Sequence, residues 1–210
     1  MKIRWRGHAS FLIETNQYRI ISDPFDKNLG YPLVREEADI VTVSHEHYDH
    51  NAVETILGNP QIIRGTGRFA LAGAEITGFP SFHDKSQGKQ RGPNTIYKIV
   101  AEGLSVVHLG DLGDILNRQQ IDEIGNVDIL LIPVGGVFTI NGEEAWELVN
   151  LIKPQVTIPM HFNTSHLSFD LLPVENFSQK FDKVVKMPLL EVNLQNIKEK
   201  PAVVVLDYLF

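Results

Sequence analysis

The chain has 210 residues, of which 43% are hydrophobic and 21% charged, and its formal net charge is −7. This is the composition of a soluble globular protein that can bury a sizeable core. The acidic balance argues against general nucleic-acid binding, which usually needs a basic face. Because the sequence contains no cysteine, disulfides, thiolate metal sites and cysteine nucleophiles are excluded.

Short apolar runs rich in Val, Ile and Phe recur along the chain, separated by Gly, Pro, Asn and Asp. Such runs predict β-strands. The expected strands cover residues 3–5, 11–14, 18–22, 40–44, 61–64, 75–79, 95–100, 104–108, 129–133, 156–160 and 202–206. Early strands follow one another like a meander, whereas later strands alternate with helices. We therefore expect an α/β (α+β) fold, with two packed central sheets and helices on their outer faces.

The clearest helix is expected at residues 141–153. Asn141 and Glu144 form a capping-box pattern, apolar residues follow at helical spacing, and Pro154 ends the segment. Weaker patterns predict helices at residues 51–57, 118–124 and 174–181. The sequence shows no repeat, low-complexity tract or linker, so we expect one domain covering residues 1–210.

Neither a leader nor a membrane span is expected. The apolar stretch after the first basic residues ends at Glu14, which is too short for a signal-peptide core. The longest uncharged run, residues 129–142, is interrupted by Pro133 and two glycines. We therefore expect a cytoplasmic protein whose partner is a small-molecule substrate rather than nucleic acid or membrane. Homo-oligomer formation stays open.

The most informative segment is residues 45–50, which read His-Glu-His-Tyr-Asp-His directly behind the strand expected at 40–44. Neutral imidazole and carboxylate bind Zn, Mn, Fe or Ni strongly. His45 and His47 are two residues apart, so an extended backbone points both side chains the same way. Asp49 and His50 follow a possible turn and could face a second ion.

Other histidines and aspartates follow further expected strands. Strand ends are where a β scaffold delivers side chains to a shared rim, so this placement predicts a composed metal site. The residues concerned are Asp23, His83, His108, Asp111 and His161.

Taken in chain order, these motifs resemble those of the metallo-β-lactamase superfamily. The resemblance runs over nearly the whole chain and rests on Ser22-Asp23-Pro24, residues 45–50 as an HxHxDH motif, His83, Gly110-Asp111 and Met160-His161-Phe162. Residues 7–11 and 132–136 look like the subgroup that includes ascorbate-6-phosphate lactonase and many uncharacterised hydrolases. The family fold that this resemblance implies is a four-layer αββα sandwich.

The resemblance also implies two divalent metal ions, with Zn expected first and Mn, Fe or Ni as alternatives. One ion would be held by His45, His47 and His83. The other would be held by Asp49, His50 and His161, with Asp111 bridging the two. His108 could replace His83, because it also ends a strand. The family pattern places this ligand before the strand pair 95–100 and 104–108, which favours His83.

Several nearby residues have two interpretations each. Asp23 either orients a ligand histidine or is a turn carboxylate before Pro24. His8 either lines the cleft or is structural, and His166 either contacts substrate or lies in a solvated loop. A set of basic side chains could bind a phosphate or carboxylate of a substrate, or could simply face solvent. This set is Arg64, Arg68, Lys85, Lys89 and Arg91.

These features predict a metal-dependent hydrolase in which a metal-bridging hydroxide attacks an ester, lactone or phosphoester of a small, anionic substrate. Asp49 could take and return a proton. A phosphorylated lactone or a small phosphodiester is the first substrate to expect. The alternatives are an iron-dependent redox enzyme of the same fold and a metal-binding protein that has lost catalysis.

Overall fold

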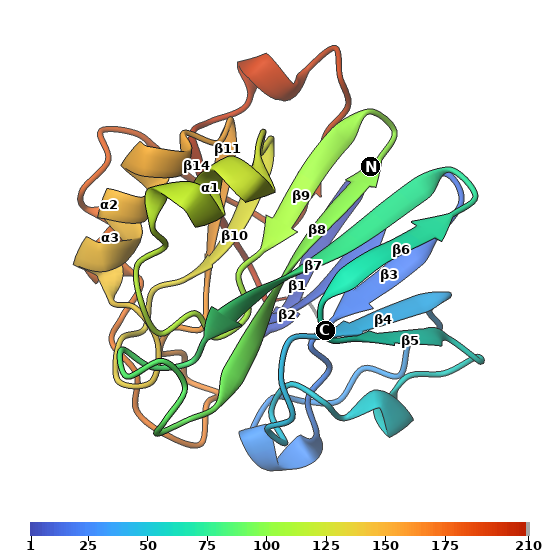
Figure 1. Ribbon diagram of the computed structural model, residues 1–210, viewed down its shortest axis with the longest axis horizontal. Coiled ribbons are helices and arrows are strands. Elements are labelled where there is room, and N and C mark those ends of the chain that lie inside the picture. The colour runs from blue at the N-terminus through green and yellow to red at the C-terminus, as the bar shows by residue number, and fades with distance from the viewer. Residues whose placement is uncertain (209–210) are drawn as a thin grey trace.

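Two mixed β-sheets form the centre of the protein in the computed structural model, which describes residues 1–208 (Figure 1). The first sheet contains β1 (Lys2–Gly7), β2 (Ser10–Glu14), β3 (Arg19–Ser22), β4 (Ile40–Val43), β5 (Gln61–Arg64) and β13 (Leu190–Glu191). The second contains β6 (Gly67–Leu71), β7 (Ala74–Phe82), β8 (Pro93–Ala101), β9 (Leu104–His108), β10 (Ile129–Pro133), β11 (Val156–Met160), β12 (Val184–Met187) and β14 (Val203–Leu206).

Each sheet combines antiparallel and parallel pairing. The strand order is β13-β1-β2-β3-β4-β5 in the first sheet and β12-β14-β11-β10-β9-β8-β7-β6 in the second. β3, β4 and β5 run parallel to one another, as do β9, β10 and β11. Parallel neighbours end at the same edge of a sheet, so the residues that follow β3 and β4 lie side by side. The expectation of two packed central sheets with outer helices is confirmed.

Helices α1 (Arg118–Ile124), α2 (Gly142–Ile152) and α3 (Glu175–Ser178) lie beside the β9–β11 part of the second sheet (Figure 1). The expected capping box of α2 is present, because the Asn141 side chain accepts from the Glu144 N–H while the Glu144 carboxylate accepts from the Asn141 N–H. The helix ends at Lys153, which adopts a left-handed conformation before Pro154. Its buried face includes Ala145 and Leu148, both in the main core cluster.

The outer face of the first sheet is covered differently. The helix expected at residues 51–57 is only the 3-10 turn η2 (Val53–Thr55), which has no side-chain cap. Ile56, just beyond it, packs with Val41 and Val43 in a small separate cluster. Two other 3-10 turns are η1 (Lys27–Leu29) and η3 (Ile197–Glu199). The helix expected at 174–181 is also shorter than predicted and covers only Glu175–Ser178.

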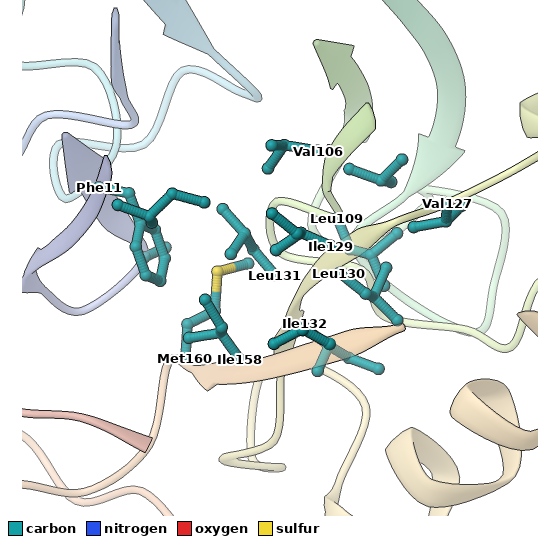
Figure 2. Packing of buried hydrophobic residues seen from close by; sticks show 14 of the residues in the cluster. Phe11, Val106, Leu109, Val127, Ile129, Leu130, Leu131, Ile132, Ile158 and Met160 are labelled. Atoms are coloured by element: carbon teal, nitrogen blue, oxygen red, sulfur yellow. The ribbon is translucent and has the colours of Figure 1, made fainter. Parts of the chain in front are cut away.

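The main core lies between the sheets. Phe11 of β2 belongs to the same cluster as Leu131 of β10 and Met160 of β11, and all three are fully buried (Figure 2). Burying a side chain of this size contributes roughly 1.5–3 kcal/mol. The cluster therefore holds the sheets, and the loops at their ends, in a fixed relation.

Three short strands were absent from the sequence expectation. β6 is an edge strand with mostly exposed side chains, β12 contains an exposed lysine, and β13 has two residues. None has the apolar run that marks the buried strands. Separately, no helix within residues 1–208 is long and apolar enough to cross a membrane.

Candidate metal centre

A backbone turn divides the histidine-rich segment, residues 45–50, into two halves. β4 ends at Val43, and residues 44–50 leave the sheet as bends and turns. The N–H groups of His50 and Asn51 both donate to the His47 carbonyl, at 3.0 and 3.1 Å. This turn separates His45 and His47 from Asp49 and His50, as the two-ion interpretation requires.

Asp23 organises the base of this segment. It follows β3, the parallel neighbour of β4, and is fully buried. Its Oδ1 accepts from the Ser44 N–H at 2.8 Å, and its Oδ2 accepts from the Ser44 hydroxyl at 2.5 Å. Oδ2 also lies 2.9 Å from Nδ1 of His50. Because a carboxylate only accepts, His50 donates from Nδ1, which leaves Nε2 as the nitrogen that could bind an ion.

The same carboxylate reaches His45 through Ser44. Nδ1 of His45 lies 2.9 Å from the Ser44 oxygen, whose hydrogen is already donated to Asp23. His45 therefore donates from Nδ1 to Ser44, and its Nε2 is left as an acceptor. A single buried aspartate thus sets the ring orientation of two histidines, one directly and one through a serine.

His45, His47 and His83 form the first cluster. One nitrogen from each ring lies within 4.8 Å of the others. Nε2 of His45 is 3.0 Å from Nδ1 of His47. His83 comes directly after β7, so the second sheet supplies this member of the cluster. The structure brings together the three histidines that the resemblance assigned to one ion.

Asp111 lies at the junction of the two halves. Its carboxylate is buried among four imidazoles, with Nε2 of His161 at 3.2 Å, His83 at 3.3 Å, His50 at 3.3 Å and His45 at 3.9 Å. Its N–H donates to the Asn94 side chain at 3.0 Å. Gly110 before it has φ +57, and a Cβ there would come within 2.3 Å of Asn94 Oδ1. Glycine is therefore needed to seat Asp111.

The second cluster contains His50, His161 and, in addition, His8. Their ring nitrogens lie within 4.8 Å of one another, and all three side chains are buried. Asp49 borders this cluster, with Oδ2 3.7 Å from His50 Nε2 and 3.2 Å from His8 Nε2. His161 follows β11 in a left-handed conformation with φ 51. A non-glycine residue held there costs about 1–2 kcal/mol, so the fold sustains strain to place this side chain.

The donor atoms at this centre fit divalent cations. Several buried atoms make no hydrogen bond within residues 1–208, namely both ring nitrogens of His8 and His161, Nε2 of His50, Nδ1 of His83 and Oδ1 of Asp111. An unpaired buried polar atom costs roughly 1–3 kcal/mol, so this concentration at one place calls for a compensating ligand. Imidazole nitrogen and carboxylate oxygen are the donors that Zn, Mn, Fe and Ni accept.

The electrostatics keep several of these imidazoles neutral. Burial, assisted by His161, lowers the pKa of His8 to about 4. Burial, assisted by His50, lowers the pKa of His45 to about 3. His50 differs: burial alone would lower its pKa, but Asp111 and Asp49 outweigh burial and raise it well above the usual value. A neutral ring is the form that binds a metal, and a cation at His50 would replace its proton.

His108 and His166 lie outside both clusters. His108 is fully buried, Nε2–H donates to the Ala9 carbonyl at 2.7 Å, and Nδ1 accepts from the Gly110 N–H at 3.0 Å. Both ring nitrogens are therefore used in holding backbone. The half-buried ring of His166 lies among aromatic side chains, 5.6 Å from Tyr31 between centroids. Geometry thus places His83, rather than His108, with the first cluster.

A cleft of about 510 Å³ opens onto the clusters. It is lined by His47, Asp49, His83 and Asp111, and by Glu46, Tyr48, Arg91, Phe138 and Phe169. An adjoining cavity of about 310 Å³ reaches His45 and His47 and shares Arg91. The sequence carried no signal for Phe138 and Phe169, because each stands in a loop without an adjacent motif.

The basic residues expected near the site separate into two kinds. Arg64 pairs with Glu46, Arg68 with Glu75, and Lys85 with Glu144. Lys89 is exposed and lines neither cavity. Arg91 lines both, and its guanidinium lies 4.4 Å over the ring of Phe138.

The loop carrying Arg91 is rigidly built. Asp84 accepts hydrogen bonds from four backbone N–H groups, those of Ser86, Gly88, Gln90 and Arg91, at 2.7–3.1 Å. These bonds hold the Asp84 carboxylate inside the loop and lower its pKa, although burial opposes them. The backbone of Arg91 is therefore held in place by hydrogen bonds within its own loop.

Comparison with known proteins gives consistent relatives. A family model described as a Beta-lactamase superfamily domain matches residues 2–161. A UPF0173 metal-dependent hydrolase of Archaeoglobus fulgidus is 32% identical over 230 aligned positions, which cover 94% of this chain and 96% of that protein. A similar protein of Methanopyrus kandleri is 30% identical and covers 92% of this chain and 95% of its own.

Solved structures share the fold. A candidate Zn-dependent hydrolase of the metallo-β-lactamase superfamily from Thermotoga maritima is 39% identical, with a TM-score of 0.82 over 98% of this chain and 97% of that chain. Igni18, a metallo hydrolase from Ignicoccus hospitalis, is 26% identical, with a TM-score of 0.65 over 85% of this chain and 89% of its own.

Proposed function

The chain belongs to the metallo-β-lactamase superfamily, and within it to the family of UPF0173 metal-dependent hydrolases; on that premise we propose that it hydrolyses an ester, lactone or phosphoester of a small anionic molecule at a two-ion centre. The observation that carries this proposal is the buried Asp111 carboxylate, which lies 3.2–3.9 Å from four imidazoles beside an open cleft. One carboxylate shared between two histidine clusters is the arrangement that a pair of cations needs.

The residues divide into two ligand sets. His45, His47 and His83 would hold one ion, and Asp49, His50 and His161 would hold the other, with Asp111 between them. Zn is the first ion to test, because the Thermotoga maritima relative is named for it. Two ions held in this way would supply a nucleophilic water of lowered pKa and would offset negative charge on the substrate. No serine or cysteine nucleophile is needed.

Asp49 is the group in the cleft that could move a proton. It lines the cavity, is half-buried, and has Oδ2 3.2 Å from His8 Nε2. Burial would raise its pKa, but His50 and His8 outweigh burial and lower it. The carboxylate is therefore ionised at neutral pH. With the ions bound, this carboxylate would take the proton of the nucleophilic water and return it to the leaving oxygen.

The cleft favours a small substrate with a negative group. Among the lysines and arginines that the structure describes, only Arg91 lines the two cavities at the clusters. Its planar guanidinium can hold a carboxylate or phosphate through two parallel hydrogen bonds. Phe138 and Phe169 offer apolar contact beside it. The likeness of residues 7–11 and 132–136 to the ascorbate-6-phosphate lactonase subgroup supports a phosphorylated lactone as the first compound to assay.

The test is turnover by metal-loaded protein on phosphorylated and plain lactones, phosphodiesters, thioesters and β-lactams. We expect hydrolysis of an anionic member that is lost on chelation and regained with metal. Replacing Arg91 with Ala should raise KM for that member about 10- to 100-fold, the effect of one lost charged hydrogen-bond pair, with little change in kcat. Lys85→Ala is the matched control, because Lys85 sits on the same loop but pairs with Glu144.

An unchanged KM in the Arg91 variant would refute the anion-binding role while leaving hydrolysis intact. The alternative of iron-dependent redox chemistry stays testable, because the same donors accept iron. Iron-loaded protein that consumes dioxygen and hydrolyses none of these compounds would replace the hydrolase proposal. Fully metal-loaded protein that is inert in both assays would instead favour a metal-binding protein without catalysis.

A further inference from the structure

His8 is a buried histidine that the five ligand motifs leave out, and the fold holds it with unusual firmness. It stands in the turn between β1 and β2, in a left-handed conformation with φ 52. Its carbonyl accepts from the Trp5 indole N–H at 2.8 Å and from the His161 N–H at 3.1 Å. Glycine would adopt this conformation without the strain that histidine carries. The presence of histidine here therefore suggests a role for its imidazole.

The side chain points into the second cluster. Its ring centroid lies 4.2 Å from that of His161 and 5.1 Å from that of His50. A ring nitrogen of His8 lies within 4.8 Å of one on each of these histidines. Neither nitrogen of His8 makes a hydrogen bond within residues 1–208. The side chain is fully buried and lines neither cavity at the site, so it is not placed to touch substrate.

His108 shows what a purely structural histidine looks like in the same protein. It is equally buried, yet both of its nitrogens are bonded to backbone groups. His8 has no such partners and faces ligand histidines instead. His161 also has two nitrogens without a hydrogen bond, and His50 has one, Nε2. A buried imidazole without hydrogen bonds that faces such nitrogens is in the environment of a metal ligand.

We propose that His8 is a third imidazole ligand of the second ion, beside His50 and His161. The inference rests on the proposed two-ion centre and deepens it. With Asp49 and the shared Asp111, the second ion would have five protein donors, whereas the first would have three imidazoles and the shared carboxylate. A set of five suits divalent ions that commonly accept five or six ligands, such as Mn, Fe or Ni, and would require Zn to expand beyond its usual four.

One competing role must be separated from ligation. Nε2 of His8 lies 3.2 Å from Asp49 Oδ2, so His8 could instead position Asp49 by donating to it. Glutamine at position 8 can still donate from its amide to that carboxylate but provides no imidazole. The pair His8→Gln and His8→Ala therefore distinguishes the two roles.

The first experiment measures ion stoichiometry and affinity by elemental analysis and chelator competition. We expect both His8 variants to keep one ion and to lose at least 100-fold in affinity for the other. His166→Gln, which also removes one histidine but lies outside both clusters, should retain two ions. Full second-ion affinity in either His8 variant would overturn the proposal, and recovery in the Gln variant alone would assign His8 to positioning Asp49.

A second experiment uses the wild-type chain and does not depend on variants folding. Nitrogen-15 NMR of labelled histidines on addition of Zn counts the rings whose nitrogens move to metal-bound shifts. We expect all six histidines of the two clusters to move. Five moving rings, with His8 unshifted, would overturn the role of His8 while the two-ion centre stands. Movement of the first cluster alone would overturn the two-ion centre as well.

Discussion

Replacing Asp23 with Asn should weaken binding of the second ion, although Asp23 touches neither ion in the proposed centre. The substitution keeps the side-chain volume but turns one oxygen into an NH2 donor. Oδ1 faces the Ser44 backbone N–H, which cannot turn away, so the amide oxygen must take that place. The NH2 group then faces Nδ1 of His50, which must become an acceptor. The His50 proton then moves from Nδ1 to Nε2, the nitrogen that would bind the second ion.

The magnitude follows from the bonds lost. The contact between Asp23 and His50 is a buried charged hydrogen bond of 2.9 Å. Bonds of this kind contribute about 1.5–3 kcal/mol, which is roughly a 10- to 150-fold change in affinity. Outer residues that orient metal-bound histidines typically change affinity about 10- to 100-fold. We expect a loss in this range for the second ion and a smaller one for the first, because Ser44 can rotate its hydroxyl.

The assay is chelator competition on the wild type and on Asp23→Asn, with both ion affinities resolved. Asp39→Asn is the matched control, because Asp39 is exposed and its carboxylate accepts from the Arg19 backbone N–H, away from the histidine clusters. Circular dichroism should show that both variants are folded. Unchanged affinity for the second ion in folded Asp23→Asn, or a loss confined to the first ion, would refute the orienting role of Asp23.

Three further outcomes are expected. Asp111→Asn should weaken both ions at least tenfold, because Asp111 contacts both clusters; loss of only one ion would contradict a bridging role. Metal-free protein should lose stability in urea as pH falls from 6.5 to 4, because the depressed pKa of His8, about 4, lets the unfolded state bind protons first. His8 alone accounts for up to about 3 kcal/mol of this loss, and a flat profile would contradict its burial as a neutral ring. His83→Ala should lose the first ion, whereas His108→Gln should keep both and only unfold more easily; the reverse would exchange their roles.

The elements that could be predicted from the sequence are those whose signal lies in neighbouring residues, such as an apolar run or a capping box. Buried strands such as β10 and β11 are made almost entirely of apolar residues, and their bounds agree with expectation. α2 carries its capping box in adjacent residues. β6 and β12 lie at sheet edges and have no such run, so only their pairing with neighbours makes them strands.

The site follows the same division. The residues 45–50 and the histidines and aspartates behind other strands were visible because strand ends converge on one rim. The link from Asp23 through Ser44 to His45 was not visible, because it depends on β3 and β4 being parallel neighbours. The sequence also could not single out Arg91 among the basic residues. That distinction depends on which carboxylates pair with the other basic side chains in the fold.

The most direct test of the two-ion centre is elemental analysis of protein purified without a metal-affinity tag and then saturated with Zn or Mn. Two tightly bound ions per chain, falling to fewer in Asp111→Asn, are the expected result for a carboxylate shared by two histidine clusters. One ion per chain at saturation, or a metal content that Asp111→Asn leaves unchanged, would contradict it.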